Sequence, residues 1–276
     1  MQNLRLRPRG TRGLITEVTP ASAGWSYVGF ALHRLDAGEA VEARTGTREV
    51  CLVLVSGKAR LTIDSKDFGE IGERMSPFDG APWAAYAPAG SRYALTATTA
   101  LELGVCSAPG GVGFPAKLIP PSAHPQIARG KGSNTRHVTN IMPEEDGSAN
   151  ALLVVEVITP GGNTSSYPPH KHDRDDVPNE SYLEETYYHR FNPRQGFGFQ
   201  RVYTDDRSLD ETAVIEDGDV VMVPKGYHPV ATLHGYDSYY LNVMAGPKRI
   251  WKFHNEPQHE WLFTGVGSPE SAKKTA

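Results

Sequence analysis

The sequence predicts an all-β protein whose strands form a sandwich or a barrel, and three observations support this. Gly and Pro account for 28 and 21 of the 276 residues, so turns are frequent. Between these turns lie short runs rich in β-branched and aromatic residues, as in strands. No long segment repeats apolar residues at helical spacing, and many short strands bounded by turns are typical of sandwiches and barrels. The clearest predicted strands are 50–55, 59–63, 152–158, 197–203, 220–223 and 238–244.

Composition and charge exclude two classes of partner. The chain carries 28 Lys and Arg against 32 Asp and Glu, a net charge of −4, without the clustered basic residues that phosphate contacts need. We therefore expect no nucleic-acid partner. The best apolar run, 151–158, contains Glu156 and is much shorter than the ~20 residues of a membrane span. No membrane partner is expected either.

The N-terminus and the cysteines bear on the location of the protein. The first 13 residues are rich in arginine but are broken by Pro and Gly, and no apolar segment follows them, which argues against a targeting peptide. Cys51 and Cys106 fall in predicted buried strands, so a disulfide framework is not expected. Together these features favour a reduced, cytoplasmic protein.

A stretch rich in Gly and Pro at 108–115 indicates where the chain divides. We expect a first domain at 1–115 and a second at 116–276. The segment 120–140, with several further Pro and Gly residues, is interpreted as a connector that wraps the second domain.

Three histidines and a glutamate in the second domain form the strongest functional signal. His170 and His172 are two residues apart, so in a strand both imidazoles face one side. Glu185 opens a later strand, and His228 follows a tight Pro-x-Gly turn. We prefer Glu185 over its neighbour Glu184 because the two halves of the chain align on it. Imidazole and carboxylate ligands suit one divalent metal ion, either Zn or one of Mn, Fe and Ni.

The order of these residues resembles the two-part signature of the cupin barrel, and the first half repeats it in altered form. Glu42 and Arg44 stand where the His-x-His pair would fall, and Tyr93 stands in the place of the last histidine. Only Glu49, aligned with Glu185, keeps its type. The sequence therefore predicts a bicupin, made of two double-stranded β-helix (jelly-roll) barrels. The first barrel lacks metal ligands, and the second carries the active site.

Longer stretches of the second half resemble the 5-deoxy-glucuronate isomerases of myo-inositol catabolism, a bicupin family related to the uronate ketol-isomerases. The matching stretches are 168–173, 183–193, 196–198, 200–210, 223–230 and 239–247. The resemblance implies an aldose–ketose isomerase that converts 5-deoxy-D-glucuronate to 5-dehydro-2-deoxy-D-gluconate through a metal-stabilised enediol. It also implies one bound divalent ion, with His170, His172, Glu185 and His228 as its ligands.

The isomerisation needs a base that moves a proton between two carbons. The candidates are Glu185, Tyr187 and His189, which share one face of a predicted strand. Glu185 is compromised as a base if it binds the metal, and a metal-bound hydroxide is a further alternative.

A sugar-acid substrate also needs a cation for its carboxylate. Arg201 is the candidate, because an arginine pairs with a carboxylate through two hydrogen bonds. Lys225, in the turn before His228, is either at the mouth of the cavity or solvated. Lys171 alternates away from the histidines, so we expect it at the surface. Further residues are expected at the substrate or in the core: Tyr203, Tyr240 and Asn242 as cavity candidates, and Trp251 and Phe253 as structural residues.

Two other functions fit the same pattern. Three histidines and a glutamate also suit an Fe(II)-dependent cupin oxygenase, which would consume oxygen when substrate is added. A non-enzymatic sugar-binding bicupin is the third hypothesis, although storage cupins usually lack the ligands kept here. The oligomeric state is open, since bicupins often pair through their barrel faces.

Overall fold

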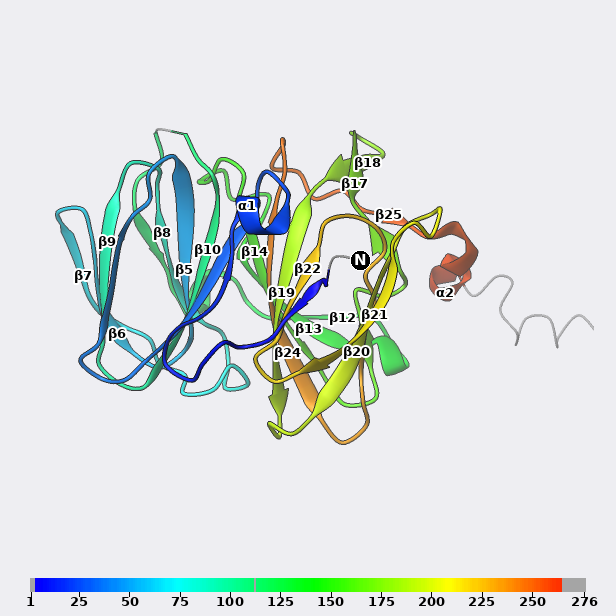
Figure 1. The fold of residues 1–276 in the computed structure, drawn as a ribbon, viewed down its shortest axis with the longest axis horizontal. Coiled ribbons are helices and arrows are strands. Elements are labelled where there is room, and N and C mark those ends of the chain that lie inside the picture. The colour runs from blue at the N-terminus through cyan, green and yellow to red at the C-terminus, as the bar shows by residue number, and fades with distance from the viewer. Residues whose placement is uncertain (1–2, 112, 265–276) are drawn as a thin grey trace, which may run out of the picture.

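Two β-barrels lie side by side in the molecule, the first drawn in blue and cyan and the second mainly in green to orange (Figure 1). The computed structural model describes residues 3–111 and 113–264. In each barrel a large antiparallel sheet faces the other barrel, and a four-stranded sheet closes the far side. The predicted all-β architecture of two jelly-roll barrels is confirmed.

The first barrel combines a six-stranded sheet, in the order β11-β8-β5-β10-β3-β2, with a four-stranded sheet in the order β4-β9-β6-β7. Its strands are β2 (Gly13–Val18), β3 (Gly29–Leu35), β4 (Ala40–Arg44), β5 (Arg48–Ser56), β6 (Ala59–Ile63), β7 (Lys66–Ile71), β8 (Trp83–Ala87), β9 (Arg92–Ala97), β10 (Leu101–Pro109) and β11 (Lys117–Ile119).

The second barrel combines a seven-stranded sheet, in the order β1-β22-β19-β24-β14-β13-β12, with a four-stranded sheet in the order β15-β23-β20-β21. Two short pairs, β16-β25 and β17-β18, complete it. Its strands are β1 (Arg5–Leu6), β12 (Ile127–Arg129), β13 (Arg136–Met142), β14 (Leu153–Thr159), β15 (Thr164–Ser165), β16 (His170–Lys171), β17 (Asp173–Asp176), β18 (Glu180–Tyr182), β19 (Glu184–Asn192), β20 (Phe197–Tyr203), β21 (Asp210–Glu216), β22 (Val220–Val223), β23 (Val230–Thr232), β24 (Asp237–Ala245) and β25 (His254–Asn255).

Helices are short among the described residues. They are α1 (Pro20–Ala23), the 3₁₀ turns η1 (Pro121–Ala123), η2 (Gly132–Asn134) and η3 (Pro257–His259), and α2 (Trp261–Thr264). In this part of the chain, no helix has the length and apolar character needed to span a membrane.

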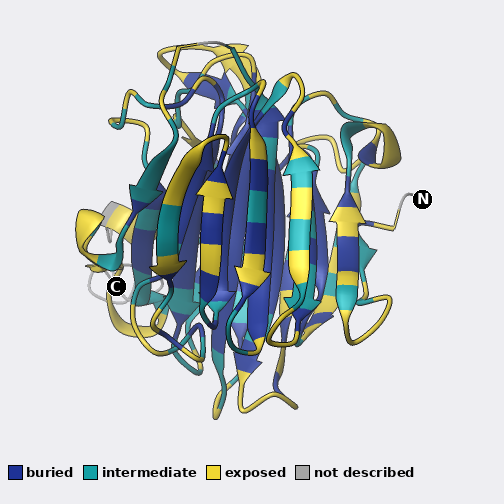
Figure 2. Ribbon diagram, turned by 90° about the vertical axis from the view of Figure 1, so that its left-hand side faces the viewer, coloured by how far each residue is buried: buried dark blue, intermediate teal, exposed yellow. Residues whose placement is uncertain are grey.

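The burial of each strand follows from its place in a barrel. In β6, on the outer sheet of the first barrel, buried and exposed residues alternate strictly, because only one side faces the core. The central strand β5 is buried at every position between its ends, since it has the barrel core on one side and the second barrel on the other. Figure 2 shows this contrast between the banded outer sheet and the uniformly buried strands behind it.

The two large sheets pack against each other through an apolar layer that draws on both barrels. At its centre Phe30 stacks on Tyr188, with ring centroids 5.9 Å apart. Gly104 allows the sheets to approach closely, because a Cβ at this position would lie 2.8 Å from the side chain of Leu241. Ion pairs also join the two barrels: Arg74 and Glu156 are both almost fully buried and 2.8 Å apart, and Arg190 of the second barrel lies 2.5 Å from Glu102 of the first.

Two strands pair across the predicted domain boundary at residue 115. β1, at the start of the chain, pairs with β22 of the second barrel. β11, which follows the boundary, pairs with β8 of the first. Each barrel is therefore completed by a strand from the other side of residue 115.

Candidate metal centre and cavity

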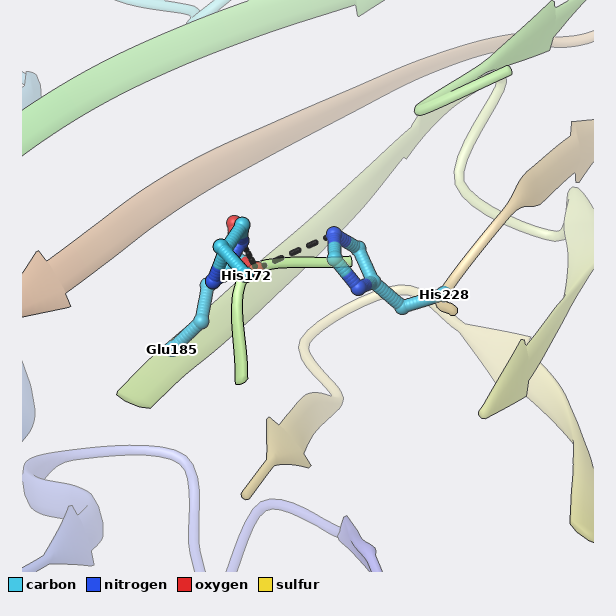
Figure 3. Close-up of side chains that lie close together, drawn as sticks. All are labelled: His172, Glu185 and His228. Atoms are coloured by element: carbon cyan, nitrogen blue, oxygen red, sulfur yellow. Dashed lines mark ion pairs between the residues drawn. The ribbon is translucent and has the colours of Figure 1, made fainter. Parts of the chain in front are cut away.

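Three of the predicted ligands meet inside the second barrel. His172 lies between β16 and β17, Glu185 is near the start of β19, and His228 lies between β22 and β23. One carboxylate oxygen of Glu185, Oε2, is 3.1 Å from Nε2 of His172 and 3.2 Å from Nε2 of His228. All three side chains are buried, and Figure 3 shows the two imidazoles directed at the carboxylate from different elements.

Backbone carbonyls fix which nitrogen of each ring faces the carboxylate. Nδ1 of His172 is 3.0 Å from the carbonyl oxygen of Leu183, and Nδ1 of His228 is 2.8 Å from that of Gly226. Because a carbonyl oxygen only accepts, each Nδ1 carries the proton and donates it. The lone pair of each Nε2 therefore points at Glu185.

A cation between the three converging atoms would satisfy all of them. Nε2 of His172, Nε2 of His228 and Oε2 of Glu185 are buried without a hydrogen-bond partner. Burial would raise the pKa of Glu185, but its surroundings, including a hydrogen bond from Asn242 to Oε1, hold it at about 2, so the carboxylate is charged. Two ligands each about 2.1 Å from one metal ion lie about 3.0–3.4 Å apart, which matches the observed spacing. The residues fit a divalent ion.

His170 lies beside this cluster rather than within it. Its ring centroid is 5.0 Å from that of His228 and 6.4 Å from that of His172, and it packs on Phe253 at 4.7 Å. Within the described ranges, the close donor set contains His172, Glu185 and His228. The role of His170 as the fourth ligand stays a prediction.

A cavity opens from the cluster between the large sheet and the C-terminal segment. Among the predicted residues, Tyr187, Tyr240 and Asn242 line it. The hydroxyl of Tyr187 is 3.0 Å from Oγ of Ser166. The remaining lining residues include Val138, Val155, Val157, Tyr167, Pro168, His170, Glu185, Trp251, Phe253, Asn255 and Phe263.

His189 does not reach this cavity. It is fully buried behind Tyr187, with the two rings stacked and their centroids 5.9 Å apart. Its Nε2 is 3.0 Å from Oε1 of Gln200. Burial lowers the pKa of His189 to about 4, so the ring is neutral near neutral pH.

Arg201, Tyr203 and Lys225 also lie outside the cavity. In β20 it is Gln200 and Val202 that point inward, so Arg201 is on the outer face, where it forms an ion pair of 2.7 Å with Asp210. Tyr203 is buried, but its hydroxyl donates to Glu256 at 2.5 Å. Lys225 is exposed in its turn. The expectation that Arg201 faces the substrate is wrong because the strand alternates the other way.

The expectation of a surface position for Lys171 is also wrong. Its side chain is 2% exposed, and Nζ lies 3.0 Å from Asp173 and 2.8 Å from Asp205. The second oxygen of Asp173 accepts from the backbone N–H of Gly226, and the second oxygen of Asp205 accepts from the hydroxyl of Tyr227. Lys171 thus joins the strand of His170 to the turn that precedes His228.

The expected equivalence of Glu49 in the first barrel and Glu185 in the second is wrong. Glu49 faces the other barrel and accepts from the backbone N–H groups of Ala151 and Leu152, both at 2.7 Å. Glu184 does the same in reverse, accepting from the backbone N–H groups of residues 26–28. Glu49 is therefore the counterpart of Glu184, and the counterpart of Glu185 is Val50, which packs in the core of the first barrel.

Several cavity residues were missed or misjudged from the sequence. Arg129 and Arg136 line the cavity from the predicted connector, where no motif marks them. Trp251 and Phe253 were expected to be structural, but both face the cavity. The available signal was weak, namely two arginines and two aromatic residues placed near the predicted motif.

The fold and the site define a bicupin with a candidate metal centre in its second barrel. Residues 4–262 match the model of the KduI/IolB family, and the chain therefore belongs to this family. The predicted family resemblance is confirmed.

Relatives and solved structures agree with this assignment. The chain is 55% identical to a 5-deoxy-glucuronate isomerase of Geobacillus kaustophilus, over 91% of both chains, and 48% identical to that of Listeria innocua, over 94% and 95%. An IolB-like protein from Salmonella typhimurium superposes with a TM-score of 0.93 at 52% identity, covering 95% of this chain and 99% of the other. An oxalate decarboxylase of Bacillus subtilis shares the fold, with a TM-score of 0.64 at 14% identity over 100% and 84%.

Proposed function

We propose that the protein isomerises 5-deoxy-D-glucuronate to 5-dehydro-2-deoxy-D-gluconate, an aldose–ketose interconversion, in myo-inositol catabolism. Relatives of similar length at 48–55% identity carry the name of this activity. The observation that carries the chemistry is the convergence of three buried donor atoms, from His172, His228 and Glu185, of which Glu185 lines the cavity. We further propose His170 as a fourth ligand, because it lines the same cavity beside His228.

The donor set supports one divalent ion, Zn or Mn, Fe or Ni. When bound, such an ion supplies Lewis-acid stabilisation of the negative charge that develops on an enediol oxygen, worth several kcal/mol. Asn242 donates a hydrogen bond to the other oxygen of Glu185 and so holds that carboxylate in place.

We propose Tyr187 as the proton-transfer residue. Among the three base candidates, Glu185 is occupied by the donor cluster and His189 lies behind the cavity wall. Burial raises the pKa of Tyr187 well above its usual range, so the phenol holds its proton in the resting protein. From there it can donate its proton to a substrate oxygen and take the same proton back when the product forms, while a hydrogen bond with Ser166, 3.0 Å away, holds the hydroxyl in place.

The proposal is tested by following 5-deoxy-D-glucuronate by NMR before and after chelation of the protein. We expect chelation to abolish turnover and a returned divalent ion to restore it. His172→Ala should lose both bound metal and turnover while keeping its thermal unfolding transition, whereas the exposed Lys248→Met should keep all three. Full activity in the metal-free protein would contradict the proposal.

The same assay separates the alternatives. Two histidines and one carboxylate are also the donor set of non-haem iron oxygenases, so an Fe(II) oxygenase predicts oxygen uptake when the acid is added. An isomerase predicts none. A sugar-binding protein without activity predicts binding of the acid but no new NMR signals with any metal.

The setting of the protein follows from its thiols and its substrate class. Cys51 and Cys106 are both free and buried, and free thiols are typical of a reducing compartment. We therefore place the protein in the cytoplasm, acting on a small sugar acid. Assembly into a homo-oligomer stays a prediction.

A further inference from the structure

Two arginines stand directly opposite each other at the edge of the cavity. In the antiparallel pair β12·β13, Arg129 and Arg136 are Cα partners, so their side chains leave the sheet on the same face. Both line the cavity that also contains Glu185 and His170. The two arginines and Glu185 of the donor cluster therefore line the same cavity.

No carboxylate of the described chain neutralises this pair. Neither arginine forms an ion pair in the described part of the chain, and Arg136 donates a hydrogen bond of 3.1 Å to the carbonyl oxygen of Asn134. Burial, reinforced by the charge of Arg129, lowers the pKa of Arg136. Like charges directly opposite in a ladder destabilise it, so the arrangement favours an anion between the two guanidinium groups.

The sheet places the arginines and the donor cluster at opposite ends of the cavity. β13, which carries Arg136, is separated from β19, which carries Glu185, by β14 and β24. That is three strand spacings, or about 14 Å between backbones. Charge lies at one end, and the metal ligands lie at the other.

The floor between the two ends is apolar next to the arginines. Val155 and Val157 of β14 line the cavity and are almost fully buried. They pair with Asn242 and Tyr240 of β24, which lie closer to Glu185. From β13 to β19, the side chains that line the cavity are thus cationic on β13, apolar on β14, polar on β24 and part of the donor cluster on β19.

We propose that Arg129 and Arg136 form a carboxylate clamp that makes the site specific for acids over neutral sugars. The proposal rests on the isomerase function proposed above. A 5-deoxy-uronate has the matching order, with a carboxylate, a methylene and hydroxyl-bearing carbons that lead to the aldehyde. The methylene lies over Val155 and Val157, where a hydroxyl would lose its hydrogen bonds to water without replacement.

The first test compares 5-deoxy-D-glucuronate with its neutral primary amide in the protein as purified. We expect the wild type to favour the acid in kcat/KM by about 100-fold, because charge-assisted, two-pronged hydrogen bonds are lost with the amide. Arg136→Met and Arg129→Met should each reduce this preference at least tenfold, mainly through KM and with unchanged metal content. Arg136→Lys should recover part of it. The exposed Arg60→Met is the matched control and should keep the full preference.

A second measurement does not depend on turnover. 2-Deoxy-D-gluconate has the carboxylate and methylene but no carbonyl group, and its binding is followed by calorimetry. We expect its affinity to fall at least tenfold in each cavity variant but not in Arg60→Met. Without the ligand, Arg129→Met should melt at the same temperature as the wild type or higher, because it removes a like-charge contact.

The two measurements separate the failure of the clamp from the failure of the isomerase function. An undiminished preference for the acid in both single variants and in the double variant would overturn the clamp. If the wild type turns over neither acid nor amide, the isomerase function fails, and the binding of 2-deoxy-D-gluconate then decides the clamp alone. Unchanged binding in the cavity variants overturns it.

Discussion

Glu184 and Glu185 are neighbours in β19, yet their carboxylates lie on opposite faces of the sheet and serve different barrels. Glu184 accepts three backbone N–H groups from residues 26–28 of the first barrel, at 2.6–3.0 Å. Glu185 meets His172 and His228 in the second. A shift of one residue along the strand therefore separates a contact between the barrels from a member of the candidate metal centre.

Substituting each glutamate separately should separate stability from metal binding. Glu184→Gln leaves buried N–H groups facing an amide in place of a charge, so we expect the free energy of unfolding to fall by about 3 kcal/mol. Metal content per folded molecule should stay the same. Glu185→Gln should lose the metal with a smaller change in the unfolding of the metal-free protein. Denaturant titration and metal analysis of both variants check this, and loss of metal in Glu184→Gln alone would reverse the assignment.

Replacing Tyr187 should impair the chemical step. Tyr187→Phe removes a hydroxyl at the cavity while keeping the ring, so we expect kcat to fall by about 10²- to 10⁴-fold with unchanged metal content. Steady-state kinetics and metal analysis measure the two quantities. Tyr86→Phe is the matched control, because that hydroxyl is also buried but bonds to Glu49 at the barrel interface. Equal activities in the two variants would remove Tyr187 from the mechanism.

Replacing the buried Lys171 should lower the free energy of unfolding far more than replacing an exposed lysine in an ion pair of similar length. Lys171→Met leaves Asp173 and Glu180 without their cation, and we expect a loss of about 3 kcal/mol in unfolding free energy. Metal affinity should weaken too, because the strand of His170 loses its link to the turn before His228. Lys248→Met breaks an exposed 2.8 Å pair with Asp175 and should cost less than about 1 kcal/mol. If both variants lost a similar amount of unfolding free energy, this result would contradict the buried position of Lys171.

His189 should make stability depend on pH. Its pKa is about 4 in the folded protein, because burial disfavours the charged ring, against about 6.5 in an unfolded chain. Between these values the unfolded chain binds the extra proton. The contribution of neutral His189 to the free energy of unfolding is therefore fully present above pH 6.5 and is lost as the pH falls towards 4.

The size of this effect is measured against a variant that does not titrate. From pH 7.5 to pH 5, the wild type should lose about 2 kcal/mol more unfolding free energy than His189→Gln. The other histidines titrate in both proteins, so the difference isolates His189. Parallel stability curves for the two proteins would contradict the lowered pKa.

The sequence predicted the barrels and most of the donor cluster because both follow from local patterns. Alternation and turn residues locate strands such as β6. The His-x-His spacing keeps His170 and His172 close, with ring centroids 6.4 Å apart, although His172 lies just beyond the end of β16. The structure brings Glu185, the preferred residue, next to His172 and His228, but the alignment of Glu49 that supported this preference is wrong. Matching two glutamates by residue type does not show which face of the sheet each side chain occupies, because that is set by the register of strand pairing.

The missed residues depend on contacts between distant segments. Lys171 does alternate away from the histidines, but the space there is filled by Asp173, Glu180 and Asp205 rather than by water. Arg136 enters the cavity because β13 lies next to the edge strand β12 of the large sheet, where Arg136 pairs with Arg129. Neither fact is present in the local sequence around these residues.

The reciprocal placement of β1 and β11 means that neither half of the polypeptide is an independent folding unit. A chain cut after residue 115 would give an N-terminal piece without β11 and a C-terminal piece without β1. Each piece would expose an unpaired sheet edge, at β8 and β22, together with the apolar layer that the barrels share. Open edges of this kind promote self-association, so the first barrel is needed to keep the second barrel in its native form.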